Sequence, residues 1–167
     1  MAINTFGFDQ LDAMLDSQLF VQNMKQIFPR AHARIGTKFV GDARKAIIVD
    51  KIYKPNALST IVRKGSSTPL VDKGDLVGSL TYDVKDHLVV ELGINSPRLS
   101  SGRFLYEVLH NGATIKRGGS TWTIPGRPFL TTVWESDDFV AFIEATYGEA
   151  LEAVFERSKK SKPKRDR

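Results

Sequence analysis

Cysteine is absent from this sequence of 167 residues, and no apolar run approaches the length of a membrane span. Without cysteine there is neither a disulfide framework nor a thiolate metal site. The first ten residues, MAINTFGFDQ, lack the basic and apolar segments of an export signal. We therefore expect a chain that makes no membrane contact and is synthesised in a cytoplasm.

Histidine is scarce as well, with three residues (His32, His87 and His110) far apart in the sequence. A transition-metal site needs clustered ligands, so none is predicted. Lys64 precedes Gly65, the reverse of the order in a phosphate-binding loop, and no G-x-S-x-G, H-E-x-x-H or EF-hand pattern occurs. The sequence therefore nominates no catalytic residue and no cofactor, although an enzyme site assembled from distant residues stays open as an alternative.

Positive charge is concentrated at one end of the chain. Residues 157–167, RSKKSKPKRDR, hold seven Lys or Arg and one Asp, a net charge of +6. Because the whole chain carries +5, residues 1–156 carry −1. Such a block cannot bury a core, which predicts a single domain over 1–156 and a disordered basic tail over 157–167. The tail either is simply solvated or contacts nucleic-acid phosphates. The candidate contacts are Lys159, Lys160, Lys162, Lys164 and Arg165.

Helical patterns occupy both ends of the domain. From Phe8 to about Asp50 apolar residues recur mostly three or four apart, and Pro29 predicts either two helices or one kinked helix. The last helix is expected to begin after Ser136 as its N-cap, with acidic residues in the first turn and an apolar face reaching Phe155.

The middle of the chain alternates in the manner of short strands separated by turns. Together with the helices this predicts an α+β fold, in which a mostly antiparallel sheet of four or five strands packs against the last helix. The strands are expected at 80–84, 87–94, 113–116 and 120–124, with a possible further strand at 129–134.

Three short segments complete the secondary-structure prediction. The stretch from Ala57 to Val71 is small and polar, typical of a long exposed loop. After it, Asp72 is the expected N-cap of a short helix, with Asp75 near its positive end; we favour this over a magnesium or acid–base role. A helix over residues 104–110 should end at Asn111–Gly112.

Three segments in this order resemble the phage virion-morphogenesis or tail-completion family, which includes Mu-like tail-completion proteins. Residues 69–80, PLVDKGDLVGSL, are similar to the pattern P-L-[VI]-D-T-G-x-L-x-x-S-[IL]. Residues 106–112, YEVLHNG, are similar to Y-A-x-x-H-x-x-G with shortened spacing, and residues 124–130, IPGRPFL, to I-P-A-R-P-F-L. The sequence departs from these patterns at Lys73, Glu107 and Gly126, which concerns the subfamily more than the family.

The resemblance implies a structural virion protein without a cofactor, acting as a homo-oligomeric ring at the head-proximal end of a long tail. It implies sixfold symmetry, contacts with the tail tube protein and with head-tail connector or neck proteins, and DNA passing through the ring lumen. Tail terminator, tail-completion protein and head-side connector all remain possible roles. The alternative is a small basic nucleic-acid-binding protein that uses its C-terminal tail.

Arg127 is the leading interface candidate. Held between Pro125 and Pro128, its guanidinium could bind a carboxylate of a neighbouring subunit or form an intrachain salt bridge. The segment from Ala57 to Thr68 is expected to become ordered on docking. The remaining candidates for the assembly interface are Phe129, Lys64, Ser66 and Ser67.

Overall fold

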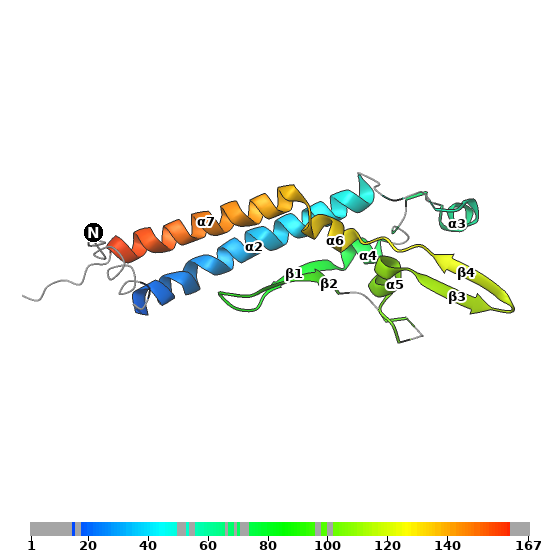
Figure 1. The fold of residues 1–167 in the computed structure, drawn as a ribbon, viewed down its shortest axis with the longest axis horizontal. Helices are drawn as coiled ribbons and strands as arrows, with labels where there is room; N and C mark the ends of the chain where they lie inside the picture. Colours follow the sequence, from blue (N-terminus) through cyan, green and yellow to red (C-terminus); the bar gives the residue numbers. More distant parts are fainter. Residues whose placement is uncertain are drawn as a thin grey trace, which may run out of the picture.

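The computed structural model describes residues 15, 18–49, 53, 56–65, 67–68, 70, 74–95, 98–99 and 102–160. It has the predicted α+β class, with a long helix near each end and short helices and hairpins between them (Figure 1). The elements are α2 (Gln18–Ile48), α3 (Leu58–Lys64), α4 (Asp75–Gly78), β1 (Leu80–Val84), β2 (Val90–Ile94), α5 (Leu105–Asn111), β3 (Ala113–Arg117), β4 (Ser120–Ile124), α6 (Phe129–Trp134) and α7 (Asp137–Lys160).

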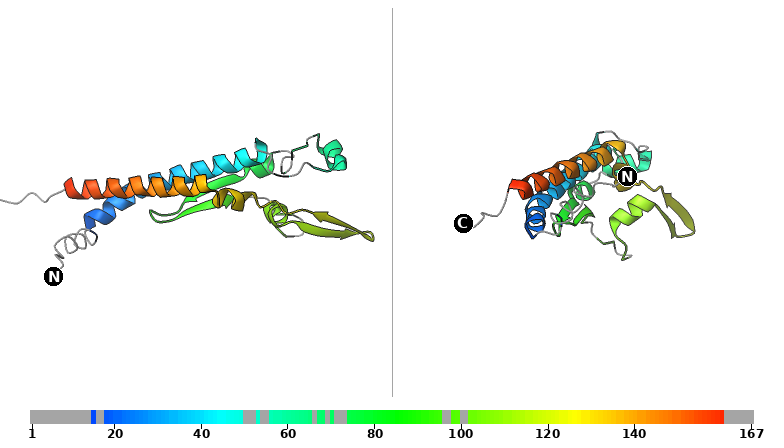
Figure 2. Two further views of the ribbon diagram at one scale, coloured as in Figure 1. Left: turned by 45° about the horizontal axis from the view of Figure 1, so that its top comes forward. Right: turned by 60° about the vertical axis from the view of Figure 1, so that its left-hand side comes forward.

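The two long helices, α2 and α7, run antiparallel and side by side (Figures 1 and 2). Ser136 caps α7 as predicted, because its Oγ accepts a hydrogen bond from the Phe139 N–H at 3.3 Å. Between the helices lies a small apolar cluster of buried residues: Phe20, Phe28, Ala31, Ala150 and Val154. This packing stabilises α2 through Pro29, so the two-helix alternative is wrong and one helix runs through the proline.

The main core lies where the second half of α2 meets α6, α4 and the start of α7. Phe129 and Phe139 are fully buried there, and the Phe39 ring lies against the Phe139 ring with centroids 5.6 Å apart. No helix of the described residues is long and apolar enough to cross a membrane.

The strands form two separate antiparallel hairpins, β1–β2 and β3–β4, rather than one sheet of four or five strands. Leu80 pairs with Ile94 in the first hairpin and Ala113 with Ile124 in the second. The β1–β2 hairpin packs on α2, which lies between it and α7 (Figure 1). The prediction that the last helix packs on the sheet is therefore wrong, since its apolar face is covered by α2 and α6.

The strand expected at 129–134 is wrong, because these residues form the helix α6. Their β-branched content favoured a strand, but Phe129 and Val133, four residues apart, are the two that are buried. That spacing puts both on one face of a helix. The strand expected from His87 also begins later, at Val90, because residues 85–89 form the hairpin loop.

Two further predictions fail between residues 57 and 75. The expected exposed loop contains α3. The helix is followed by its C-cap, Gly65, whose backbone is left-handed with φ of 70°. The N-cap of α4 is Gly74 and not Asp72, which lies outside the described residues. Asp75 is the first residue of α4, near its positive end as predicted.

The predicted start of the disordered tail is also too early. Helix α7 continues to Lys160, and the Asn23 amide donates to Ser158 Oγ at 3.0 Å, which ties this last turn to α2. The four residues 157–160 are therefore helical, and the rest of the expected tail lies outside the described residues.

Candidate functional site

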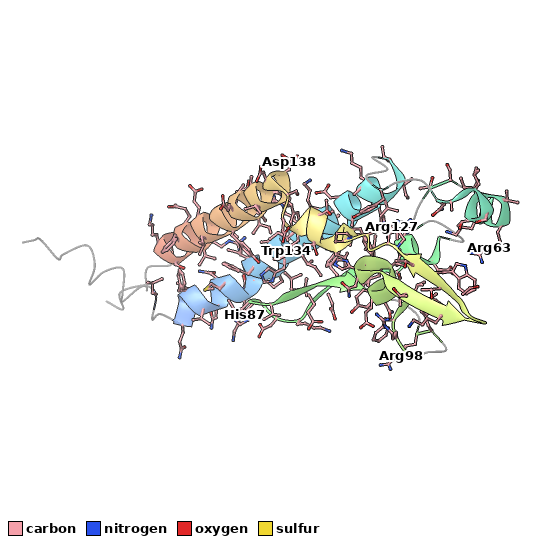
Figure 3. The ribbon with its side chains drawn as sticks, turned by 45° about the vertical axis from the view of Figure 1, so that its right-hand side comes forward. Arg63, His87, Arg98, Arg127, Trp134 and Asp138 are labelled. Carbon is pink, nitrogen blue, oxygen red and sulfur yellow. The ribbon has the colours of Figure 1, made fainter. Side chains whose placement is uncertain are left out.

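Three short helices, α3, α4 and α5, and the segments that connect them to the rest of the chain line a cavity of about 240 Å³ beyond the C-terminal end of α2. Three residues singled out in the sequence, Lys64, Asp75 and Arg127, come together in its lining. Figure 3 shows Arg127 where the chain passes from β4 to α6. The cavity is lined by Asn56, Lys64, Leu70, Asp75, Leu76, Leu105, Leu109 and Arg127.

The cavity also joins the three family-like segments. Leu70 and Leu76 belong to the first segment, Leu109 to the second and Arg127 to the third. Segments separated by 25 and 11 residues thus contribute to a single feature. This convergence gives the resemblance a common location in the fold.

The backbone at Arg127 is held by a close crossing of two chain segments. The Arg127 N–H donates to the Leu109 carbonyl at 2.9 Å. At Gly126 an added Cβ would lie 3.0 Å from the carbonyl oxygens of His110 and Asn111, and at Gly112 one would lie 2.7 Å from Gly126 N. Gly112 also has φ of 79°, a conformation that only glycine adopts readily. The crossing therefore favours glycine over alanine at position 126.

The Arg127 side chain is half-buried, and burial lowers its pKa from the usual value, while Tyr53 acts weakly in the opposite direction. Its guanidinium nevertheless stays charged at neutral pH. Among the described residues no carboxylate forms an ion pair with it within 4.0 Å. A half-buried cation without a partner is unfavourable, and a carboxylate from another molecule would relieve that cost.

Beyond the cavity, α3 and the β3–β4 hairpin project from the body of the molecule (Figures 1 and 2). Large apolar side chains on both are exposed: Leu58 by 81%, Val62 by 84% and Trp122 by 53%. Leu58 and Val62 are four residues apart and lie on one face of α3. Neither buried cluster includes a residue of α3, β3 or β4.

The remaining predicted interface residues have mixed positions. Pro125 and Pro128 are exposed beside Arg127, as an interface requires, and Ser67 is exposed as well. Phe129 is fully buried in the core, so its place in the predicted interface is wrong. Ser66 lies outside the described residues.

The predicted phosphate contacts are described only in part. Lys159 is exposed and pairs with Glu156 at 3.1 Å, an i,i+3 contact of little energetic weight. The side chain of Lys160 is not described. The other three candidates, Lys162, Lys164 and Arg165, lie outside the described residues.

The three histidines lie on separate elements. His32 is buried in α2 and packs against the rings of Phe28 and Tyr147, with centroids 6.1 and 5.7 Å away. His87 lies in the β1–β2 loop, next to Asp86, and His110 on α5 lies 3.2 Å from the Thr131 hydroxyl. In the described part of the chain, no three His, Asp or Glu side chains are grouped as metal ligands.

Sequence reasoning missed the exposed apolar surface of α3 and β3–β4. The four-residue spacing of Leu58 and Val62 was a detectable helical signal, but the surrounding small polar residues masked it. Comparisons with known protein families, with curated proteins and with solved structures find no match to this chain.

Proposed function

We propose that this chain is a structural subunit of a long-tailed bacteriophage virion, a tail-completion or neck protein that assembles into a ring. The observation that carries the proposal is the convergence of the three family-like segments on one cavity, with Arg127 in its lining. The ring would lie at the head-proximal end of the tail, between the tail tube protein and the connector. Sixfold order is taken from the resemblance.

The projecting end supports an assembling role. An isolated two-stranded hairpin is marginally stable in water, and a seven-residue helix is far too short to persist alone. Both carry exposed apolar side chains outside the core. A neighbouring molecule that covers them would bury apolar area and stabilise both elements.

Arg127 provides the test of this role. We expect Arg127→Ala to abolish assembly, because the carboxylate that pairs with the guanidinium would come from a neighbouring subunit. The melting temperature of the unassembled protein should change little or rise, since the substitution removes a half-buried charge without an ion-pair partner among the described residues. Arg30→Ala is the matched control, as Arg30 is an exposed arginine on α2.

The readout is particle mass by light scattering and symmetry by negative-stain imaging, for the protein alone and mixed with tail tubes. Wild type and Arg30→Ala should form rings, either free or on tube ends. Rings formed by Arg127→Ala would refute the assigned role of Arg127, and so would a much lower melting temperature of the unassembled variant. A wild-type protein that ignores tails would refute the proposal itself.

The rival function, nucleic-acid binding through the basic tail, makes a different prediction. It requires salt-sensitive DNA binding that disappears when residues 161–167 are deleted, a truncation that leaves all of α7 in place. The virion proposal expects that ring assembly survives this deletion. Performing both assays on one truncated protein separates the two functions.

A further inference from the structure

The projecting end of the molecule, formed by α3 and the β3–β4 hairpin, is basic. The sequences of these elements contain no acidic residue, and their basic residues are Arg63, Lys64, Lys116 and Arg117. The segment before α5 adds Arg98, which Figure 3 shows at the same end as Arg63. Arg103 lies beside it, since its carbonyl accepts a hydrogen bond from the Leu99 N–H at 2.8 Å.

This positive charge is less offset than the positive charge of the body. The basic helix α2 packs on α7, whose residues 137–156 hold six Asp or Glu and no Lys or Arg. Arg34 and Glu149, for example, pair across the two helices at 2.7 Å. The exposed side chains of Arg63, Arg103 and Lys116, in contrast, form no ion pair with another described residue. A polyanion should therefore be attracted to the projecting end.

The β3–β4 hairpin has an apolar face and a polar face. Side chains alternate along a strand and directly opposite residues share a face, so Ile115 and Trp122 lie together on the apolar one. The polar face is exposed and consists of Thr114 opposite Thr123 and Lys116 opposite Thr121. It offers three hydroxyls and an ammonium group, which are donors suited to phosphate oxygens.

The shape of the hairpin favours a DNA duplex over an acidic protein surface. The hairpin is a two-stranded ribbon that projects from the body (Figures 1 and 2). The major groove of B-DNA, about 12 Å wide, admits a two-stranded β-ribbon with phosphates along both of its edges. An acidic protein surface would require positive charge only, and not a projecting ribbon.

We propose that the hairpin enters the major groove of double-stranded DNA and that its polar face, with Arg63 and Arg103, contacts backbone phosphates. The contact is independent of base sequence, because hydroxyl and cationic groups that donate to phosphates carry no base information. The apolar face is left for a neighbouring subunit. The inference rests on the proposed ring function, in which the projecting end would face the DNA in the lumen.

DNA binding by two charge-matched variants tests this contact. The end variant carries Arg63→Gln, Arg103→Gln and Lys116→Gln. The control variant carries Lys25→Gln, Arg30→Gln and Lys45→Gln, which replace three exposed basic residues of α2. Each loses three positive charges, so the formal net charge falls from +5 to +2 in both. The affinity for a short fluorescent DNA duplex is measured by anisotropy between about 50 and 200 mM salt.

The end variant should lose affinity and salt dependence together. Each lost phosphate contact lowers the slope of log affinity against log salt by about 0.9, so three contacts should lower it by about 2–3 and the affinity at 0.1 M salt by about 100-fold. The control variant should bind almost as tightly as wild type. Lys116→Gln alone, outside both buried clusters, should lower the slope by about 1 and serves if the triple variant is unfolded by circular dichroism.

Two further arms identify the partner. Deleting residues 161–167 should leave most of the DNA affinity, and binding that disappears with this deletion would overturn the contact by assigning it to the basic tail. Duplex RNA of the same sequence should bind at least about tenfold more weakly, because its major groove is deep and narrow. Equal binding of RNA and DNA would overturn the insertion of the hairpin into the groove.

The outcomes separate the contact from the function. Equal losses in the end and control variants would overturn the contact, since net charge and not position would then govern binding. An end variant that binds DNA normally but forms no rings would also overturn it, because the surface would then serve a protein partner. A wild-type chain that binds DNA through this end but forms no ring, alone or on tails, would overturn the proposed function and leave the contact standing.

Discussion

Gly36→Ala on α2 is predicted to destabilise the protein, although alanine is normally the better helix former. Gly36 is buried against β1, and a Cβ added there would lie 2.2 Å from Cγ and 2.8 Å from Cβ of Tyr82. The second contact matters more, because the Tyr82 Cβ cannot move without moving its strand. The ring cannot relieve the clash by changing rotamer alone.

The magnitude follows from two opposing effects. Replacing glycine by alanine in a helix gains about 1 kcal/mol. Overpacking a filled interior costs about 1–3 kcal/mol, and the backbone-linked contact places this site in the upper part of that range. The net loss is about 1–2 kcal/mol, which lowers the melting temperature of a protein of this size by about 2–8 °C.

Gly41→Ala is the matched control on the same helix. Gly41 is exposed and nothing lies within 4 Å of an added Cβ, so only the helix-propensity gain applies and the melting temperature should rise. Thermal and urea unfolding measure both variants under conditions where the protein does not assemble. If Gly36→Ala stabilises the protein as much as Gly41→Ala, the packing of β1 against α2 described above is wrong.

Two further predictions concern the crossing at Arg127 and the buried histidine. Gly126→Ala places a Cβ 3.0 Å from backbone carbonyl oxygens, so it should cost about 1–3 kcal/mol in urea unfolding. Gly148→Ala, with open space around it on α7, should cost nothing; equal stability of the two variants would contradict the crossing. Burial lowers the pKa of His32, so the folded protein resists its protonation while the unfolded chain titrates near pH 6.5. The stability that the neutral His32 contributes is complete above pH 6.5 and is lost as the pH falls toward the folded pKa, by at most about 1.4 kcal/mol per pH unit. His32→Leu should flatten this pH dependence of the free energy of unfolding. An unchanged pH profile would refute the prediction.

Local chemistry predicted the elements whose signals lie within a few residues. Ser136 and the aspartates after it marked the start of α7, and the Gly118–Gly119 pair, with φ of 56° and 77°, marked the β3–β4 turn. The strand β1 was predicted with its correct bounds for the same reason. In each case a cap or a turn residue defined the boundary.

Tertiary contacts decided where the predictions failed. Residues 129–134 fit a strand by composition, but the core required Phe129 and Val133 on one face. The two hairpins stay apart because α5 lies between them, an arrangement that no local pattern encodes (Figure 1). The cavity was equally hidden, although its member Arg127 was found from the two flanking prolines.

The division of the molecule into a packed body and a projecting end links stability to assembly. Both buried clusters belong to the body, so the cooperative unfolding of α2 and α7 contributes little to holding β3 and β4 in place. A neighbour that binds the ordered hairpin and not its unfolded form stabilises it in proportion to the logarithm of the neighbour's concentration relative to its dissociation constant. The exposed pair Ile115 and Trp122 is the apolar part of the hairpin that such a neighbour would cover. In the proposed ring, the folding of the projecting end would therefore be coupled to assembly.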